Sequence, residues 1–286
     1  MTVPVIFNPV AGRGKLAAGL SRLADRHALE LFPAADPAET RRLAADLSQA
    51  SERILVAGGD GTVHHAIRGL AGSAATLGIL AGGTGNDFAH ALGLPPELDA
   101  ALARALGGTP SRVDLGRAGE VPFAGIAGIG IVADVLTYLV EFTRRYRGNW
   151  VYPWAVLRTL VSYRALHVVV ESDSERFAGP VMMAAAANAP RFGGGMRAAP
   201  EASMQDGLLD VVILRETSRT GMVRLLPRVY RGTHLTHPAC RVFRAASVQF
   251  SSTPGATVYA DGEALPVHTA DAVTLRIDPG ALRVAL

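Results

Sequence analysis

Three glycine-rich turns carry the residues in the first third of the chain that could bind and transfer phosphate. The turns read NPVAGRGK (residues 8–15), GGDGT (58–62) and GGTGND (82–87). Glycine lets a backbone approach a phosphate closely, and helical patterns after the turns would offer free N–H groups to an anion. Thr62, Thr84 and Asn86 add side-chain donors. Asp60 and Asp87 can hold a metal ion or orient a loop. Together, the three turns predict a polyphosphate-binding site.

Each turn alone has a simpler explanation, because glycine also closes ordinary tight turns between a strand and a helix. Two standard nucleotide motifs do not fit. A Walker A loop needs GxxxxGK followed by Ser or Thr, whereas Leu16 follows Lys15 and Pro9 stands where the first glycine belongs. The dinucleotide fingerprint GxGxxG is missing from the first turn. Nucleotide binding therefore depends on the coincidence of the three turns.

The elements around these turns predict a parallel sheet. Up to about residue 115, apolar runs at 3–8, 28–32, 54–59 and 77–83 alternate with segments of helical periodicity. Such alternation with short connections is typical of a Rossmann-like α/β domain covered by helices on both faces. Ligands of these sheets bind beyond the carboxyl ends of the strands, where the three turns fall.

The pattern changes after about residue 115. Strand-like runs separated by Gly, Pro, Asp and Ser then dominate, and helical patterns occur only near 132–147, 152–163 and 218–230. Many strands with few crossover helices predict a β-rich antiparallel sandwich or barrel. We therefore expect an α/β nucleotide-binding domain at 1–115 and a β-rich domain at 116–286. The last strand could pack back near the hinge between them.

Composition narrows the class of protein. A net charge of +3 over 286 residues is too small to indicate nucleic acid binding, and no nucleic-acid motif occurs. Lys15 is the only lysine, so any step that needs a lysine must use it. The single cysteine, Cys240, excludes an intramolecular disulfide framework and suggests a reducing compartment. No secretory signal opens the chain, so we expect a cytoplasmic protein.

Six motifs resemble, in order, those of the diacylglycerol kinase catalytic-domain family. They are FNPVAGRGK, VAGGDGTV, LAGGTGNDFA, NAPRFGGGM, PEASMQDGLLDVVIL and YADGE, and they extend from Phe7 to Glu263. The family includes bacterial diacylglycerol kinases, sphingosine kinases and ceramide kinases, with NAD kinases as distant relatives. The resemblance implies a NAD-kinase-like α/β domain and a β-rich domain with ATP bound between them. It also implies Mg²⁺-dependent transfer of the γ-phosphate to a lipid hydroxyl, with diacylglycerol as the first candidate and phosphatidic acid as its product.

The resemblance also assigns roles to residues. Asp261 matches the base proposed for bacterial members, with Glu263 nearby to assist with magnesium or orientation. Asp60 is the rival base, because the corresponding aspartate of sphingosine kinases is often given that role. The implied nucleotide-binding residues are Asn8, Gly58, Gly59, Asp60, Gly61, Thr62, Val63, His64, Thr84, Asn86 and Asp87.

A second metal site is implied downstream. Bacterial relatives hold a structural Mg²⁺ through an aspartate that corresponds to Asp206, with backbone carbonyls at positions 203 and 208, here Ser203 and Leu208. Oxygen ligands suit this ion. Without the resemblance, Asp206-Gly207 and Asp261-Gly262 would each be read as a hairpin turn.

The chain departs from the family pattern at several positions. His64 and His65 stand where Asn-Glu is usual, His90 where arginine is common, and Gly125 where many members have asparagine. These departures bear on substrate identity and nucleotide affinity. We expect His64 and His90 to lie on a helix surface or pack against a loop, because no cysteine or second carboxylate joins them at metal-ligand spacing.

Residues 141–164 interleave arginines with both tryptophans of the chain, Trp150 and Trp154. This composition is typical of an anionic bilayer interface. We hypothesise peripheral contact with the inner membrane face at the lip of a lipid pocket. The alternative is an ordinary pair of helices that buries its aromatic side chains. Exposed edge strands could also pair two copies in a homodimer, or be covered.

Two other functions remain open. A NAD-kinase-like enzyme would phosphorylate a soluble nucleotide, but GGTGNDFA and PEASMQDGLLDV favour the lipid branch. A catalytically impaired, nucleotide-binding regulatory protein is the other alternative. The departures at His64, His65 and Gly125 support it, whereas the presence of Asp60, Asp261 and Glu263 argues against it.

Overall fold

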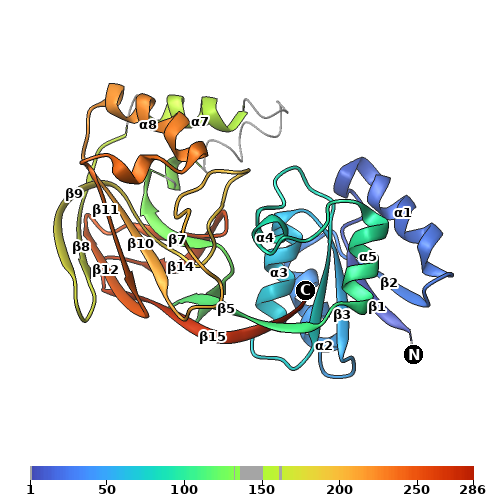
Figure 1. The fold of residues 1–286 in the computed structure, drawn as a ribbon. Coiled ribbons are helices and arrows are strands. Elements are labelled where there is room, and N and C mark those ends of the chain that lie inside the picture. Colours follow the sequence, from blue (N-terminus) through green and yellow to red (C-terminus); the bar gives the residue numbers. More distant parts are fainter. Residues whose placement is uncertain (1, 132, 136–150, 161–162) are drawn as a thin grey trace.

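The computed structural model describes residues 2–131, 133–135, 151–160 and 163–286, which form two lobes (Figure 1). The first lobe contains a parallel sheet in the order β4-β3-β1-β2. Its strands are β1 (Val3–Phe7), β2 (Leu29–Pro33), β3 (Arg53–Gly58) and β4 (Thr76–Ala81). All three glycine-rich turns therefore follow the carboxyl ends of neighbouring strands.

Helices cover both faces of this sheet because successive strand residues point to opposite sides. Val5 packs with Leu20 of α1 and Leu102 of α5, whereas Ile6 packs with Ile67 of α3 in a separate core. The helices of this lobe are η1 (Ala11–Gly14), α1 (Lys15–Ala24), α2 (Pro37–Leu47), α3 (Asp60–Leu70), α4 (Asp87–Ala91) and α5 (Leu98–Gly107). The predicted Rossmann-like arrangement is confirmed.

The second lobe is built mainly from antiparallel strands around its own apolar core. Its strands include β6 (Val121–Phe123), β7 (Ile126–Gly130), β8 (Leu166–Glu171), β9 (Arg176–Ala187), β10 (Leu209–Arg215), β11 (Cys240–Ala245), β12 (Ser247–Thr253), β13 (Thr257–Ala260) and β14 (Glu263–His268). Its helical segments α7 (Val151–Leu160), α8 (Arg219–Arg231) and η2 (His234–Thr236) complete the lobe, with α7 and α8 lying together on one side (Figure 1). The predicted β-rich half is confirmed.

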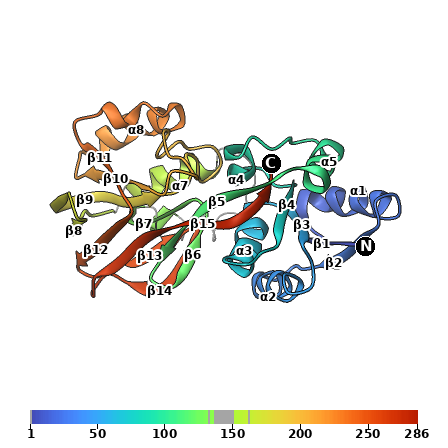
Figure 2. The ribbon, with the colours of Figure 1, turned by 60° about the horizontal axis from the view of Figure 1, so that its bottom comes forward.

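Two long strands connect the lobes. β5 (Pro110–Ala118) and β15 (Val273–Ala285) pair antiparallel and run from one lobe into the other (Figure 2). The end of β15 also pairs in parallel with β4, so the strands form one continuous sheet. The predicted boundary at 115/116 falls inside β5 and remains a prediction.

Two points concern the helices of the second half. The predicted helix near 132–147 lies mostly outside the described residues, as do Trp150 and the arginines between 141 and 150. Among the residues that the structure describes, none of the helices is both long and apolar enough to cross a membrane.

Candidate functional site

The turns after β3 and β4 lie against each other, and this close approach explains their glycines. A Cβ atom on Gly83 would lie 2.6 Å from the Cα of Gly59, and one on Gly58 would lie 2.6 Å from Thr62. Real Cβ atoms do not approach other atoms so closely, so larger residues would force the turns apart. The glycines therefore bring two loops and the start of α3 together in a small space.

Asp60, the first residue of α3, joins these two turns. Its carboxylate accepts hydrogen bonds from the backbone N–H groups of Asn86 and Asp87, both at 2.7 Å. Asn86 has a left-handed backbone, and its side chain bonds both backbone groups of Gly83. Of the two roles considered for Asp60, these contacts favour orienting a loop over holding a metal.

Asp87 links the two lobes. Its carboxylate accepts the N–H groups of Gly194 and Gly195 at 2.7 and 2.9 Å. Burial raises the pKa of Asp87 above its ordinary value, and the two hydrogen bonds partly oppose that effect. Like Asp60, this carboxylate is engaged in fixing the loops around the cleft.

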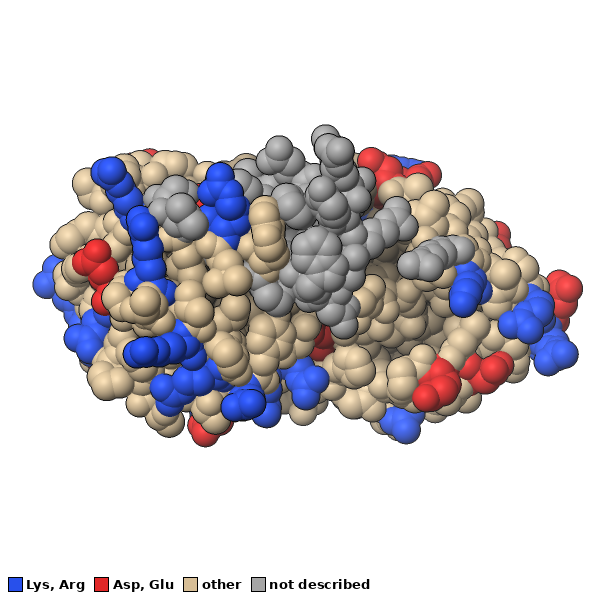
Figure 3. All heavy atoms as spheres, turned by 90° about the horizontal axis from the view of Figure 1, so that it is seen from above, with Lys and Arg blue, Asp and Glu red and all other residues tan. Residues whose placement is uncertain are grey.

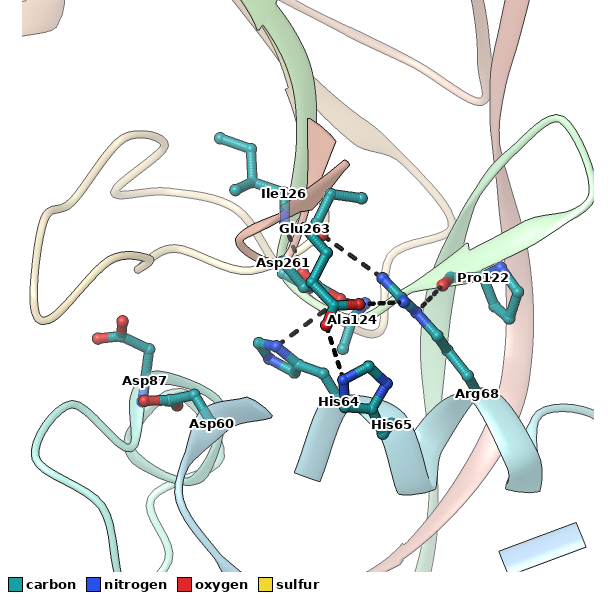
Figure 4. Close-up of polar contacts among 12 residues, drawn as sticks. Asp60, His64, His65, Arg68, Asp87, Pro122, Ala124, Ile126, Asp261 and Glu263 are labelled. Atoms are coloured by element: carbon teal, nitrogen blue, oxygen red, sulfur yellow. Dashed lines mark hydrogen bonds and ion pairs between the residues drawn. The ribbon is translucent and has the colours of Figure 1, made fainter. Parts of the chain in front are cut away.

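Asp261 lies on the opposite side of the cleft, in the turn between β13 and β14 (Figure 4). Its backbone is left-handed, with φ of 51°, a conformation that aspartate tolerates better than most residues. The carboxylate accepts the N–H groups of Ala124, Gly125 and Ile126 at 2.7, 2.8 and 3.2 Å. Its side chain is only 2% exposed, and Nδ1 of His64 lies 4.0 Å from its Oδ2.

Glu263 pairs with two residues of α3. Its carboxylate oxygens lie 2.7 Å from Nε2 of His65 and 2.7 Å from Nη1 of Arg68. The hydrogen bond from His65 and the charge of Arg68 lower the pKa of Glu263 to about 2, although partial burial opposes them. Arg68 also donates to the carbonyl oxygens of Pro122 and Ala260. This network ties α3 to the second lobe.

Helix α3 separates two pockets of different character. A more open pocket of about 440 Å³, called the polar pocket here because Asn8, Thr62 and Glu263 line it, is formed by the three turns, the start of α2 and Glu263. On the other side, a largely apolar cavity of about 150 Å³ is lined by residues of both lobes, among them Phe88, Ile126, Phe192, Tyr259 and Asp261. Gly61, Thr62 and His65 line the polar pocket. Asp60 and His64 line the apolar cavity.

The structure brings most of the candidate residues to these two pockets. The polar pocket contains Asn8, Gly59, Gly61, Thr62 and Glu263, and the apolar cavity contains Asp60, His64, Asp87 and Asp261. Gly58 and Asn86 support the turns, and Thr84 is exposed at the tip of its turn. Val63 is different, because its side chain is buried in the core of the first lobe.

Of the two environments expected for His64, the structure shows the second. Its side chain is 12% exposed and faces Asp261 in the turn between β13 and β14. The partners of Glu263, His65 and Arg68, were not anticipated. Their spacing of three residues, which places them on one helix face, was the signal available in the sequence.

The proposed structural metal ligands lie away from both pockets, in the turn before β10. Oδ1 of Asp206 accepts the N–H of Leu208 at 3.1 Å, and Oγ of Ser203 accepts the N–H of Gln205. Within the described ranges, no cluster of three or more His, Cys, Asp or Glu residues could hold a metal. A metal here would therefore need backbone carbonyl oxygens beside Asp206, a hard-oxygen donor set that suits Mg²⁺. The site remains a prediction.

Comparison with known proteins agrees with this architecture. The family model for the diacylglycerol kinase catalytic domain matches residues 2–118, and that for the YegS C-terminal NAD kinase beta sandwich-like domain matches 125–286. A diacylglycerol kinase of Mycobacterium tuberculosis is 33% identical over 275 residues, covering 91% of this chain and 88% of that protein. The chain belongs to the diacylglycerol kinase catalytic-domain family.

Other members of this family are more distant in sequence. A diacylglycerol kinase of Bacillus subtilis is 27% identical over 270 residues, covering 91% of this chain and 88% of the relative. A crystal structure of a diacylglycerol kinase from Bacillus anthracis superposes with a TM-score of 0.76 at 22% identity, covering 99% of this chain and 96% of that one. The similarity to that structure concerns the fold. The resemblance inferred from the six motifs and the predicted fold class are both confirmed.

Proposed function

We propose that this member of the diacylglycerol kinase family is an ATP- and Mg²⁺-dependent lipid kinase. It transfers the γ-phosphate to a lipid hydroxyl, with diacylglycerol as the preferred substrate and phosphatidic acid as the product. One observation carries the proposal: a polar, glycine-lined pocket and an apolar cavity lie on opposite sides of the first turns of α3. A lipid kinase needs both kinds of site next to each other.

The polar pocket supports ATP as the phosphate donor. Gly59 and Gly61 leave its wall bare, and Thr62 lies at the start of an 11-residue helix whose N-terminus favours anions. Asn8 lines the same pocket and already accepts the N–H of Val10, which shapes the first turn. Phosphoryl transfer depends mainly on such positioning.

Magnesium would be held largely by the nucleotide. Bound Mg²⁺ would neutralise charge on the phosphates during transfer. Asp60 and Asp87 already accept two backbone N–H groups each, and Glu263 is ion-paired with His65 and Arg68. These carboxylates fit a positioning role better than that of dedicated metal ligands, so phosphate oxygens would supply most of the coordination.

The apolar cavity supports a lipid as the acceptor. Its aromatic and aliphatic walls would surround an uncharged headgroup. The hydroxyl of the lipid would then lie next to Asp261. At about 150 Å³ the cavity is smaller than a typical site for a whole ligand, so the acyl chains would extend outside it. Of the two candidate carboxylates, we place Asp261 next to the hydroxyl, because it lies beside His64 in the cavity wall, whereas Asp60 holds the loop at Asn86.

Peripheral membrane contact through 141–164 is part of this proposal. In the described part of that segment, Trp154 and Leu157 of α7 are exposed. α8 packs beside α7, with Val223 also exposed and arginines at 219, 224, 228 and 231. On the face seen in Figure 3, the arginines gather over the second lobe. Exposed apolar side chains among arginines suit an anionic bilayer surface.

The first test is transfer of labelled γ-phosphate from ATP, with Mg²⁺, to a panel of lipids in mixed micelles and to NAD. We expect label on diacylglycerol, a large loss of transfer in Asp261→Asn, and unchanged transfer in Asp46→Asn, a control whose carboxylate lies on the surface of α2. Label on NAD alone would favour the soluble-substrate alternative. ATP binding without label on any acceptor would favour the regulatory alternative.

A further inference from the structure

His64, which departs from the family pattern, lies in the wall of the apolar cavity beside Asp261. It lies on α3 between the polar pocket and the apolar cavity, and its ring meets Phe88 edge-on with centroids 6.5 Å apart. Its Nδ1 is fully buried, has no hydrogen-bond partner among the described residues, and lies 4.0 Å from Oδ2 of Asp261. Figure 4 shows the ring beside Asp261, on the side that faces Asp60 and Asp87.

We propose that His64 is a catalytic residue that accepts the proton of the substrate hydroxyl, with Asp261 stabilising the imidazolium that forms. The inference rests on the proposed lipid kinase function and specifies how its proton is removed. The asparagine usual at this position in the family can donate a hydrogen bond to a carboxylate but cannot serve as a base.

The contacts of Asp261 support this division of roles. Its Oδ1 accepts two backbone N–H groups, its Oδ2 accepts one, and the side chain is almost completely buried. The remaining lone pair on Oδ2 is the one available to Nδ1 of His64. The carboxylate is thus held in place beside the imidazole, and we assign the proton of the hydroxyl to the other ring nitrogen, Nε2. A carboxylate that orients an imidazole and stabilises its charged form is an established arrangement for a general base.

Charges around the cavity favour the same arrangement. Asp60 on α3, Asp87 on α4 and Asp261 on the β13–β14 turn line it, together with Arg191 and the neutral phenol of Tyr259. Three carboxylates against one guanidinium would compensate a positive charge that develops on the ring. The other charged groups nearby, His65, Arg68 and Glu263, are paired with one another towards the polar pocket.

The reaction step balances without another reactant. The hydroxyl oxygen of the lipid forms a bond to the γ-phosphorus, while the bond from that phosphorus to the bridging oxygen breaks and its electron pair leaves with ADP. The hydroxyl proton moves to Nε2 of His64. It passes to water after the products leave, which restores the neutral imidazole.

The test compares wild type with His64→Asn, which restores the residue usual in the family, and with His64→Gln. His27→Asn, in the exposed turn after α1, is the matched control. We expect His64→Asn and His64→Gln to lower kcat by about 10² to 10⁴, the usual contribution of a general base, with little change in the KM for ATP. A structural role alone would not move the pH profile. We therefore expect the pH profile of kcat in the residual activity of His64→Asn to differ from that of wild type.

Each outcome is decisive. If wild type phosphorylates a lipid and His64→Asn keeps its activity within about threefold with the same pH profile, His64 is not the base, although the kinase function stands. If one of the two variants fails to fold, the same comparison of kcat with the other variant decides. If wild type transfers phosphate to no lipid, the proposed function itself fails.

Discussion

The ion pairs of Glu263 allow a quantitative test of how the lobes are held together. In Glu263→Gln, the side chain keeps its size but loses the charge that pairs with His65 and Arg68. The pKa of Glu263 lies at about 2 in the folded protein against an ordinary value of 4.5. At about 1.4 kcal/mol for each pH unit, this difference has an upper limit of roughly 3 kcal/mol. Because the side chain is 41% exposed, solvent screening reduces the expected loss to about 1–2 kcal/mol.

The pH dependence of this loss has a definite sign. A carboxyl group whose folded-state pKa is depressed stabilises the protein when it is ionised, so its contribution is complete above the ordinary value of 4.5. The contribution disappears as pH falls from 4.5 towards about 2. The difference in unfolding free energy between wild type and Glu263→Gln should therefore be constant from neutral pH down to about 5 and should shrink below that.

Urea unfolding at several pH values measures this difference. Glu171→Gln is the matched control, because Glu171 pairs with Arg176 at 3.9 Å and both side chains are largely exposed. We expect that control to change the unfolding free energy by less than about 1 kcal/mol. The reasoning is refuted if Glu263→Gln behaves like Glu171→Gln at neutral pH, or if its effect stays the same near pH 3.

Three further substitutions test other parts of the site. Asp60→Asn replaces one acceptor oxygen with an amide NH₂, so the loop at Asn86 should loosen and the KM for ATP should rise about tenfold; an unchanged KM in initial-rate assays would contradict this role. Gly125→Ala places a Cβ 3.0 Å from Oδ1 of Asp261, and we expect kcat to fall about tenfold or more while the Tm changes by only a few degrees. A normal kcat would show that the carboxylate can shift without cost. Asp206→Asn should abolish the rise in Tm that Mg²⁺ gives the wild type relative to EDTA, and an equal rise in both proteins would exclude Asp206 as a ligand.

The parallel half of the fold could be predicted because its signals are local. Each apolar run and each helical period is contained within a few residues, and the turns that follow the strands reveal the edge where a ligand binds. The strand β14 (Glu263–His268) was not predicted as a separate element, because it follows Asp261 and Gly262 in a tight turn and shows no strong alternation. The sequence suggested only that the last strand could pack back near the hinge. It does not show that β15 pairs with β5 across both lobes, since that pairing joins positions 157 to 175 residues apart.

The roles of the carboxylates could not be separated from sequence for the same reason. Asp60, Asp87 and Asp261 each stand next to glycine or asparagine in a polar turn, so their local patterns are alike. Their partners distinguish them. Asp60 bonds a loop of its own lobe, Asp87 bonds Gly194 and Gly195 of the other lobe, and Asp261 bonds three consecutive N–H groups beside the cavity. All of these contacts join positions more than 25 residues apart, which no local pattern encodes.

Two departures from the family pattern meet at a single carboxylate, and this bears on whether the chain has lost catalysis. The N–H of Gly125 donates to Oδ1 of Asp261, and a Cβ at position 125 would press on that same oxygen. His64 approaches Oδ2 from the other side. The asparagine usual at position 125 would crowd this carboxylate, whereas glycine leaves it seated against the backbone with an imidazole beside it. Random loss of function would scatter substitutions among Asp60, Asp261 and Glu263 themselves. Here those three carboxylates are present and the changes lie next to one of them, which fits the role proposed for His64 better than a loss of catalysis.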